Sequence, residues 1–215
     1  MVLKLYGLAI APCTKRVRAI LEELNVPYEF VVVDLLKGEQ KNEAFKEHQP
    51  FGQVPYIDDD GFQLFESRAI CRYVALKYGG IGKLMPDPSD VQKTALFEQA
   101  ASIETSNFDP AASGLTSIPL HRGWPMRTCS TRESSIRVRR RCLLTMSPYR
   151  LQGKETDMHS VATFRAVFEA KLPGYEALLS KTKYIAGDVR PCVLLVRIGL
   201  IYLTMRRCVP GNLAC

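Results

Sequence analysis

The chain has 215 residues, of which 47% are apolar and 24% charged, a composition typical of a globular protein with one compact unit or two small domains. Its formal charge of +7 arises in the second half, because residues 1–115 carry 12 basic and 16 acidic side chains and residues 116–215 carry 17 and 6. Eight arginines between 118 and 151 could mark a nucleic-acid or acidic-membrane surface. No aromatic interleaving or binding motif supports this, so we expect a solvated basic segment and neither nucleic acid nor a membrane as partner.

The seven cysteines and three histidines show no Cys-x-x-Cys pair and no metal-ligand spacing, so we expect no metal site and no disulfide framework. The first residues lack the basic, apolar and small-residue series of a signal peptide, so we expect a cytoplasmic location. The run Cys192–Met205 is apolar apart from Arg197. Its 14 residues are fewer than the roughly 20 needed to span a bilayer, so we expect a buried helix there, or no ordered element.

Hydrophobic periodicity divides the first 80 residues into alternating strands and helices. The first predicted elements are a strand at 2–6 and a helix after Pro12, whose apolar face carries Val17, Ile20, Leu21 and Leu24. A strand at 28–33 and a short helix at 41–47 follow. A hairpin with strands at 54–57 and 62–65 and a helix at 67–78 complete this part of the chain. The run at 28–33 is nearly all apolar, so we expect that strand to be buried on both faces. The order β-α-β-α-β-β-α is the thioredoxin-like arrangement.

The second half begins after a linker rich in glycine and proline, so we predict domains at 1–80 and 89–215. Asp90–Leu115 is expected to form a long helix, with Leu96, Ala100 and Ile103 on one face. No period emerges at 116–160, whereas helical spacing returns between 164 and 188, with a pause at Pro173-Gly174. The predicted fold class is an α/β domain followed by an all-helical domain, in which 116–160 and 189–215 are atypical.

Two neighbouring motifs, Phe51-Gly52-Gln53-Val54-Pro55-Tyr56 and Phe65-Glu66-Ser67-Arg68-Ala69-Ile70, predict a peptide-binding groove. A cis bond before Pro55 would leave the N–H and C=O of Val54 free to pair with an extended peptide. Ser67 can cap the following helix, whose first amides and dipole suit a carboxylate, and Glu66 could take an α-amino group. Each motif alone is compatible with a tight turn and an ordinary helix cap, but their combination favours a binding site.

These motifs, with Gln49-Pro50 before the first, resemble the glutathione-binding half of the cytosolic glutathione transferases, most of all the phi class. The resemblance covers 1–115 and reappears at 164–188. It implies an enzyme that takes glutathione as co-substrate and conjugates its thiolate to small hydrophobic electrophiles in detoxification. By resemblance, the glutathione-binding residues are Gln40 (often histidine in phi enzymes), Lys41, Gln53, Val54, Pro55, Glu66, Ser67 and Arg68, and the electrophile pocket contains Ala11, Asn107 and Phe108. Read without the family, Lys41 is one exposed lysine on a polar segment.

The position that stabilises the thiolate departs from the phi pattern. An ordinary thiol with a pKa of about 8.5 is only a few per cent ionised at neutral pH, so a transferase must favour the thiolate. Phi enzymes are understood to use a serine five residues before an arginine of the first helix, and counting back from Arg16 that position holds Ala11. Cys13 and Thr14 are candidate catalytic residues, as nucleophile for mixed disulfides and as replacement donor respectively. The alternative for both is a small residue and a helix cap, and Cys13 lacks the omega-type spacing to Arg16.

Three functions remain open at this point: a transferase, a non-catalytic carrier or structural relative, such as the transferase-like domain of a translation elongation factor subunit, and a thiol-disulfide enzyme using Cys13. The family's Ser/Thr-x-x-Asp capping box is replaced here by Val189-Arg190-Pro191-Cys192. We hypothesise that Thr116–Ser160 and Val189–Cys215 are insertions or altered reading, from a retained intron or a shifted frame. Uninterrupted coding sequence with sound splice junctions in genomic DNA would refute this. We expect a homodimer if the helical domain folds. Loss of the capping box and of much of the helix set would expose apolar surface, so we predict that the full-length chain aggregates.

Overall fold

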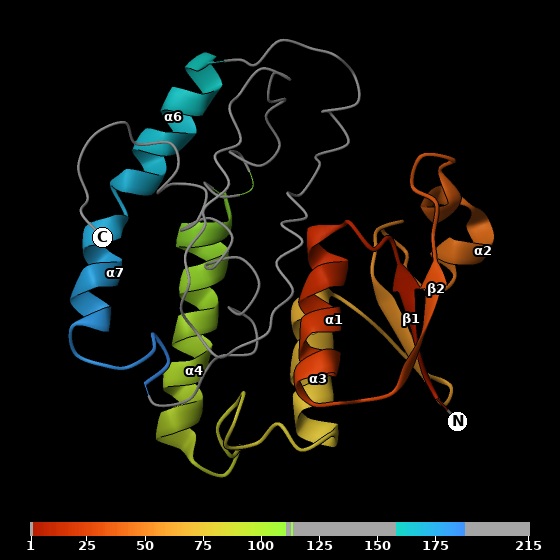
Figure 1. Cartoon of the computed structure of the whole chain (residues 1–215), viewed down its shortest axis with the longest axis horizontal. Helices are drawn as coiled ribbons and strands as arrows, with labels where there is room; N and C mark the ends of the chain where they lie inside the picture. Colours follow the sequence, from red (N-terminus) through yellow and green to blue (C-terminus); the bar gives the residue numbers. More distant parts are fainter. Residues whose placement is uncertain (1, 111–112, 114–157, 188–215) are drawn as a thin grey trace, which may run out of the picture.

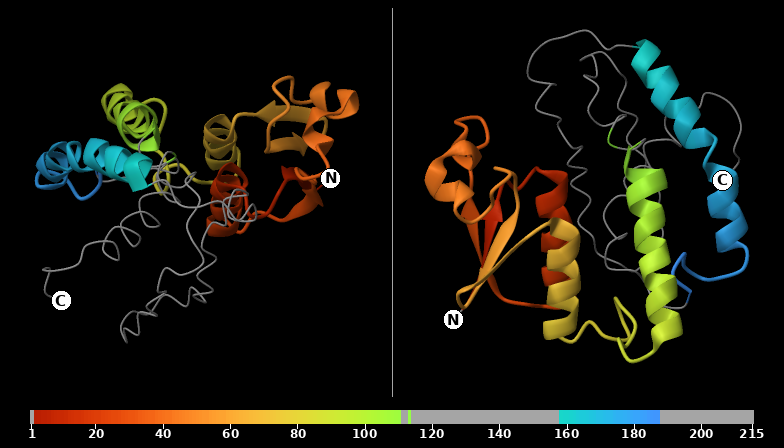
Figure 2. Two further views of the ribbon diagram at one scale, coloured as in Figure 1. Left: turned by 90° about the horizontal axis from the view of Figure 1, so that it is seen from above. Right: turned by 180° about the vertical axis from the view of Figure 1, so that it is seen from behind.

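The computed structural model describes residues 2–110, 113 and 158–187, which form a thioredoxin-like half followed by helices (Figure 1, Figure 2). The elements are β1 (Leu3–Gly7), α1 (Pro12–Glu23), β2 (Tyr28–Val32), a 3-10 turn (Glu39–Lys41), α2 (Glu43–Lys46), β3 (Tyr56–Asp59), β4 (Phe62–Phe65), α3 (Ser67–Lys77), α4 (Val91–Ile103), a π-helical turn (Glu104–Phe108), α6 (Met158–Glu169) and α7 (Leu172–Leu179). The predicted fold class is therefore confirmed. No helix in the described ranges is long and apolar enough to cross a membrane.

The four strands form one mixed sheet with the order β2-β1-β3-β4. Strand β1 is parallel to β2 and antiparallel to β3, and β3 and β4 form the predicted hairpin. The hairpin turns at Asp60 and Gly61, whose φ values of 58° and 87° suit the two-residue turn that an Asp-Gly step favours. The side chain of Asp58 closes the turn by accepting a hydrogen bond from the N–H of Gly61 at 2.8 Å.

The expectation that β2 is buried on both faces was wrong. This strand lies at the edge of the sheet and pairs only with β1 among the described strands. None of its five residues is buried, and Val32 is 63% exposed. The apolar run indicated a strand correctly, but apolar content alone does not distinguish a central strand from an edge strand.

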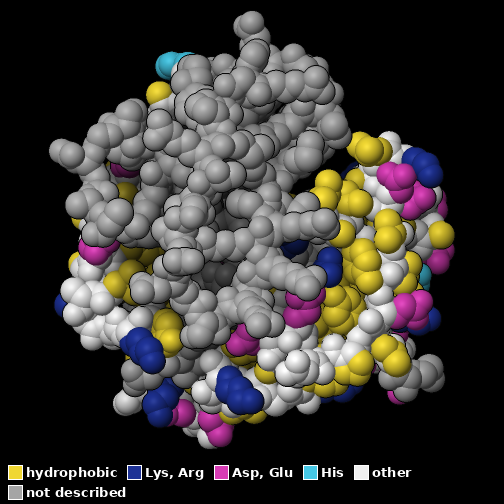
Figure 3. All heavy atoms as spheres, in the orientation of Figure 1, with side chains coloured by type: hydrophobic (Ala, Val, Ile, Leu, Met, Phe, Trp, Pro, Cys, Tyr) yellow, Lys and Arg dark blue, Asp and Glu magenta, His cyan; other side chains and the backbone are white. Residues whose placement is uncertain are grey.

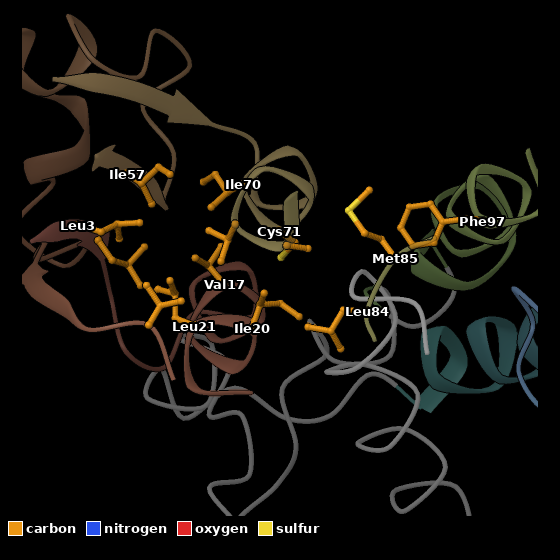
Figure 4. Packing of buried hydrophobic residues seen from close by; sticks show 14 of the residues in the cluster. Leu3, Val17, Ile20, Leu21, Ile57, Ile70, Cys71, Leu84, Met85 and Phe97 are labelled. Atoms are coloured by element: carbon orange, nitrogen blue, oxygen red, sulfur yellow. The ribbon is translucent and has the colours of Figure 1, made fainter. Parts of the chain in front are cut away.

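A continuous hydrophobic core lies between the sheet and the helices. Helices α1 and α3 pack side by side on one face of the sheet, and α2 lies on the opposite side (Figure 1). Burying each large aliphatic side chain here contributes about 1.5–3 kcal/mol. Leu84 and Met85, in the linker, extend the same core to Phe97 of α4 (Figure 4). Residues of both predicted domains, 1–80 and 89–215, thus belong to one core. The boundary between the two domains stays a prediction.

Helix α4 begins where predicted but buries a different face. Asp90 caps it by accepting a hydrogen bond from the N–H of Lys93 at 3.0 Å. Leu96 is 49% exposed, whereas the side facing the core carries Phe97, Ala100, Ala101 and Glu104. Ala100 is buried as predicted, but Leu96 and Ile103 are not, so the buried face is rotated toward Phe97 and Ala101. Helical structure continues through Pro110, and 111–112 and 114–115 lie outside the described residues.

The last described helices agree in part with the sequence prediction. Phe168 of α6 is buried, but Val167 is 47% exposed. Pro173 does not interrupt the helix, because it lies in the first turn of α7, where its missing N–H costs nothing. Helix α6 also begins at Met158, inside the segment 116–160 for which no element was predicted. The predictions for 116–157 and 189–215, including a helix at Cys192–Met205, fall outside the described residues.

Candidate glutathione site

The loop before β3 has the geometry expected of a peptide-binding groove. The Val54-Pro55 bond is cis, and Gly52 has a φ of 59°. The N–H of Gln53 donates to the side-chain oxygen of buried Gln49 at 3.1 Å, which fixes the loop. Within the described part of the chain, the N–H and C=O of Val54 have no backbone partner. An extended ligand could therefore pair with both groups, as the sequence predicted.

Lys41 lies against this loop. It is exposed, and its Nζ donates to the carbonyl of Phe51 at 3.2 Å. A Cβ on Gly52 would lie 2.7 Å from the carbonyl oxygen of Gln40 and 3.1 Å from Nζ of Lys41, so only glycine permits this close approach. The side-chain oxygen of Gln40 is buried and has no hydrogen-bond partner. An ammonium group and an amide thus lie beside this loop, where a terminal carboxylate could be bound.

The start of α3 is the second part of the candidate site, since Phe65 just before it pairs with Tyr56 just after the loop. Here the prediction needs one correction. Glu66, not Ser67, precedes the helix as its cap residue, and it makes no side-chain capping hydrogen bond. Ser67 is the first helical residue and is only 5% exposed. Glu66 is exposed and has a φ of 69°, which is uncommon for a residue other than glycine. No described residue accepts from the first three amides of the helix, those of Ser67, Arg68 and Ala69. Uncapped amides at a helix start favour an anion.

A buried ion-pair network connects α1 and α3 to the π-helical turn after α4. Arg16 is 1% exposed, and its guanidinium donates to the hydroxyl of Ser67 at 2.7 Å and approaches Glu104 at 3.4 Å. Arg68 donates to both oxygens of Glu104, at 2.7 and 2.9 Å, and to Asp109 at 2.8 Å. Burial alone would lower the pKa of Arg68, but its hydrogen bonds to Glu104 and the charge of that residue raise it. The charge of Arg68 is therefore compensated by two acidic residues that follow α4, so this geometry does not support a free positive charge for the ligand.

The two predicted catalytic residues at the start of α1 differ in their exposure to solvent. Ala11 is the cap residue and has no side chain able to cap the helix. Cys13 is partly exposed, and its Sγ lies 3.8 Å from Nη1 of Arg16. Thr14 is completely buried, its hydroxyl has no hydrogen-bond partner, and a Cβ on Gly7 would lie 2.7 Å from it. Thr14 thus packs against β1, a position that does not support its role as a donor to a ligand sulfur.

The predicted electrophile pocket is only partly supported. Phe108 is 4% exposed, and its ring lies 5.5 Å from that of Phe168 and 6.3 Å from that of Tyr175. These are core contacts between the extension of α4 and the helices α6 and α7, so Phe108 does not present an open wall. Asn107 is partly exposed.

Two exposed apolar residues in the loops after β1 and β2 were not identified from the sequence. The ends of β1 and β2 are adjacent, since Gly7 pairs with Val32 and accepts a hydrogen bond from the N–H of Val33 at 3.0 Å. The loops that follow these strands carry Ile10, which is 40% exposed, and Leu36, which is 79% exposed. Figure 3 shows several hydrophobic side chains exposed over the half of the molecule that contains the sheet. Apolar residues in loops directly after parallel strands were the signal available in the sequence.

No group of three or more histidine, cysteine, aspartate or glutamate residues in the described ranges could hold a metal ion. The arrangement instead offers a backbone free for peptide pairing and two places for carboxylates, one at Lys41 and one at the uncapped start of α3. These are contacts for a small anionic peptide.

Comparison with known proteins identifies the family. A family model for the glutathione S-transferase N-terminal domain matches residues 1–76. Glutathione S-transferase PM239X14 of Arabidopsis thaliana is 39% identical over 187 residues, which cover 86% of this chain and 73% of that protein. The crystal structure of glutathione transferase F7 from Populus trichocarpa has a TM-score of 0.73 and 30% identity, covering 95% of this chain and 84% of that one. A glutathione S-transferase-I bound with lactoylglutathione has a TM-score of 0.75 and 26% identity, covering 96% and 84%. The chain belongs to the glutathione S-transferase family, in its phi class.

Proposed function

We propose that this transferase binds glutathione between the loop at Val54 and the start of α3, and conjugates its thiolate to small hydrophobic electrophiles. In the reaction, the sulfur forms a bond to an electrophilic carbon. In a substitution, the leaving group departs from that carbon with the bonding electrons; in an addition to an activated double bond, the neighbouring atom takes up a proton. One observation carries the proposal: the N–H and C=O of Val54 have no backbone partner among the described residues, and the first amides of α3 are uncapped. Together they match a peptide with a carboxylate at one end.

The ligand orientation follows from the chemistry of each wall. The cysteinyl backbone would pair with Val54, and the γ-glutamyl carboxylate would meet the amides and hydroxyl at Ser67. Glu66 would take the α-amino group, because its exposed carboxylate lies at the same end. At the other end, Lys41 and Gln53 would bind the glycine carboxylate, with the amide of Gln40 nearby; a lysine ammonium is a suitable point charge for such a group.

The thiolate would be stabilised at the start of α1. Ala11 offers no hydroxyl, but because it does not cap the helix, the first amides remain available for a negatively charged sulfur. Of the two predicted catalytic residues, only Cys13 is accessible enough to contact the thiolate, because Thr14 is buried against β1. Exposed Ile10 and Leu36 would form an apolar surface for the electrophile.

The distance of 3.8 Å between Cys13 and Arg16 favours one second function, reduction of glutathione mixed disulfides. The Cys13 sulfur would attack the glutathione sulfur of the mixed disulfide and release the other thiol. A second glutathione thiolate would then attack the protein-bound glutathione, which restores Cys13 and forms glutathione disulfide. Glutathione supplies both electrons, so no further reductant is needed.

One set of assays distinguishes these functions. The full chain is tested for retention on immobilised glutathione, for conjugation of a chloronitrobenzene and for reduction of a mixed disulfide, alongside Cys13→Ser and Thr14→Val. Conjugation that persists in Cys13→Ser supports the transferase function. Reduction of the mixed disulfide that is lost in Cys13→Ser but kept in Thr14→Val supports the second function. Retention with neither activity would leave a non-catalytic carrier.

A cytoplasmic homodimer with a role in detoxification completes the proposal. The partly exposed Cys13 is not part of a disulfide bond, which suits a reducing compartment. Phe51 and Phe62 are 65% and 49% exposed, and large apolar side chains of this kind support contact with a second copy. Light scattering of the full chain would detect a species of twice the monomer mass; a monomer at all concentrations would contradict the dimer.

A further inference from the structure

Arg16 makes its shortest hydrogen bond to a residue of the glutathione site and not to its acidic partner. Nη1 lies 2.7 Å from the hydroxyl oxygen of Ser67, whereas Nη2 lies 3.4 Å from Glu104. Glu104 is already bound by Arg68 at 2.7 and 2.9 Å. The contact between Arg16 and Ser67 connects positions 51 residues apart, and both side chains are buried. The hydroxyl is therefore held by a charged donor inside the protein.

The chemistry of this contact determines where the hydroxyl hydrogen can point. A guanidinium has five N–H donors and no acceptor, so the oxygen of Ser67 must be the acceptor. Its own hydrogen then needs a different partner, and no described residue accepts it. Since Ser67 is the first residue of α3, that hydrogen lies beside the uncapped amides of the helix start.

The position of Arg16 also leaves one of its buried N–H groups without a hydrogen-bond partner among the described residues. Its Nε is buried and has no hydrogen-bond partner, although the other two nitrogens are used. A buried unpaired N–H is unfavourable. A guanidinium placed only to neutralise Glu104 would not need this arrangement, because Arg68 already binds both oxygens of that carboxylate.

We propose that Arg16 is a positioning residue for glutathione binding: it orients the hydroxyl of Ser67 so that the hydrogen is donated to the γ-glutamyl carboxylate. This inference rests on the proposed glutathione site. Arg16 itself does not touch the ligand; it acts through Ser67. It also connects the ligand's carboxylate end to α1 and, through Glu104, to the extension of α4.

A double-mutant cycle measured by calorimetric titration of glutathione into the full chain tests this role. Ser67→Ala and Arg16→Met should each weaken binding roughly tenfold, the loss of one charge-assisted hydrogen bond. The double variant should bind no more weakly than the weaker single variant, because both substitutions remove the same interaction. In steady-state kinetics, the KM for glutathione should rise, while the KM for the electrophile and kcat change little. Arg18→Met is the matched control, since Arg18 lies on α1 but contacts Tyr28 and Glu22 at the surface.

A glutathione analogue whose γ-glutamyl carboxylate is an amide gives an independent readout. The analogue should bind wild type more weakly than glutathione, and this discrimination should diminish equally in Ser67→Ala and Arg16→Met. If Arg16→Met does not fold, the pair Arg16→Met with Glu104→Gln removes both buried charges, and it should show the same loss of discrimination. Unchanged affinity in a folded Arg16 variant, or effects of Arg16 and Ser67 that multiply, would overturn the inference. Wild type that fails to bind glutathione would instead refute the proposed function.

Discussion

Replacing Glu104 by glutamine would remove the negative charge that two arginines share at the centre of the molecule. Glu104 has a fully buried side chain, and Arg16 is exposed by only 1%. Arg68 would keep Asp109 and some solvent contact, because 23% of its side chain is exposed. Arg16 would lose its charged partner and keep neutral ones, the hydroxyl of Ser67 and a long contact to Cys13. The uncompensated charge therefore falls mainly on Arg16.

The expected loss of unfolding free energy is about 3 kcal/mol, the lower end of the range for breaking a buried ion pair, because glutamine still accepts one hydrogen bond. This is a large part of the 5–15 kcal/mol that typically stabilises a folded domain. Urea unfolding followed by circular dichroism measures it as a shift of the midpoint without a change in slope.

Glu98→Gln provides the control for this measurement. Glu98 also binds an arginine of α3, with distances of 2.9 and 2.8 Å to Arg72, but half of its side chain is exposed (51%). Water screens that pair, so its loss should cost less than about 1 kcal/mol. If Glu104→Gln costs no more than Glu98→Gln, the argument that the buried network holds α4 against α1 and α3 is wrong.

Three further predictions concern single positions. Thr14→Val should leave conjugation unchanged and stability equal or up to about 1 kcal/mol higher, because it removes a buried hydroxyl without a partner; a tenfold loss of kcat would contradict this. Gly52→Ala should raise the KM for glutathione several-fold by displacing Lys41, whereas Gly61→Ala, which strains a turn with no atom within 4 Å, should lower stability but not change that KM; equal KM values in both variants would refute the crowding argument. Burial alone would raise the pKa of Asp59, but hydrogen bonds from Lys77 and Tyr73 of α3, and from Tyr78 just after it, lower it. The stability that Asp59 provides is therefore present above its ordinary pKa of 3.8 and is lost as pH falls below that value. Urea unfolding should show Asp59→Asn less stable than wild type at pH 7, with the difference shrinking below about pH 4; a difference independent of pH would disprove it.

Local signals in the sequence were sufficient for most of the first half of the fold. The Asp-Gly step predicted the hairpin turn, and the spacing of Val17, Ile20 and Leu21 predicted the buried face of α1, all of which are confirmed. The apolar run of β2 predicted a strand but not its edge position, because strand order depends on contacts distant in sequence. The local sequence pattern therefore predicts which helices and strands form better than it predicts which of them lie next to one another.

The site was predicted less completely, for the same reason. The motif around Val54 and the start of α3 was sufficient to propose a groove. The partner of Arg68 is Glu104, which lies 36 residues away and reaches it through a π-helical turn that no helical period predicts. Thr14 and Cys13 are adjacent in sequence, but the close approach of α1 to Gly7 buries only Thr14. These differences depend on tertiary packing and not on residue type.

The structure of the full chain crystallised with glutathione is the most direct test of the account. We predict a tripeptide whose cysteinyl backbone pairs with the N–H and C=O of Val54 and whose γ-glutamyl carboxylate meets the hydroxyl and amide of Ser67. Electron density for the tripeptide elsewhere on the molecule, or an empty groove at saturating glutathione, would contradict it.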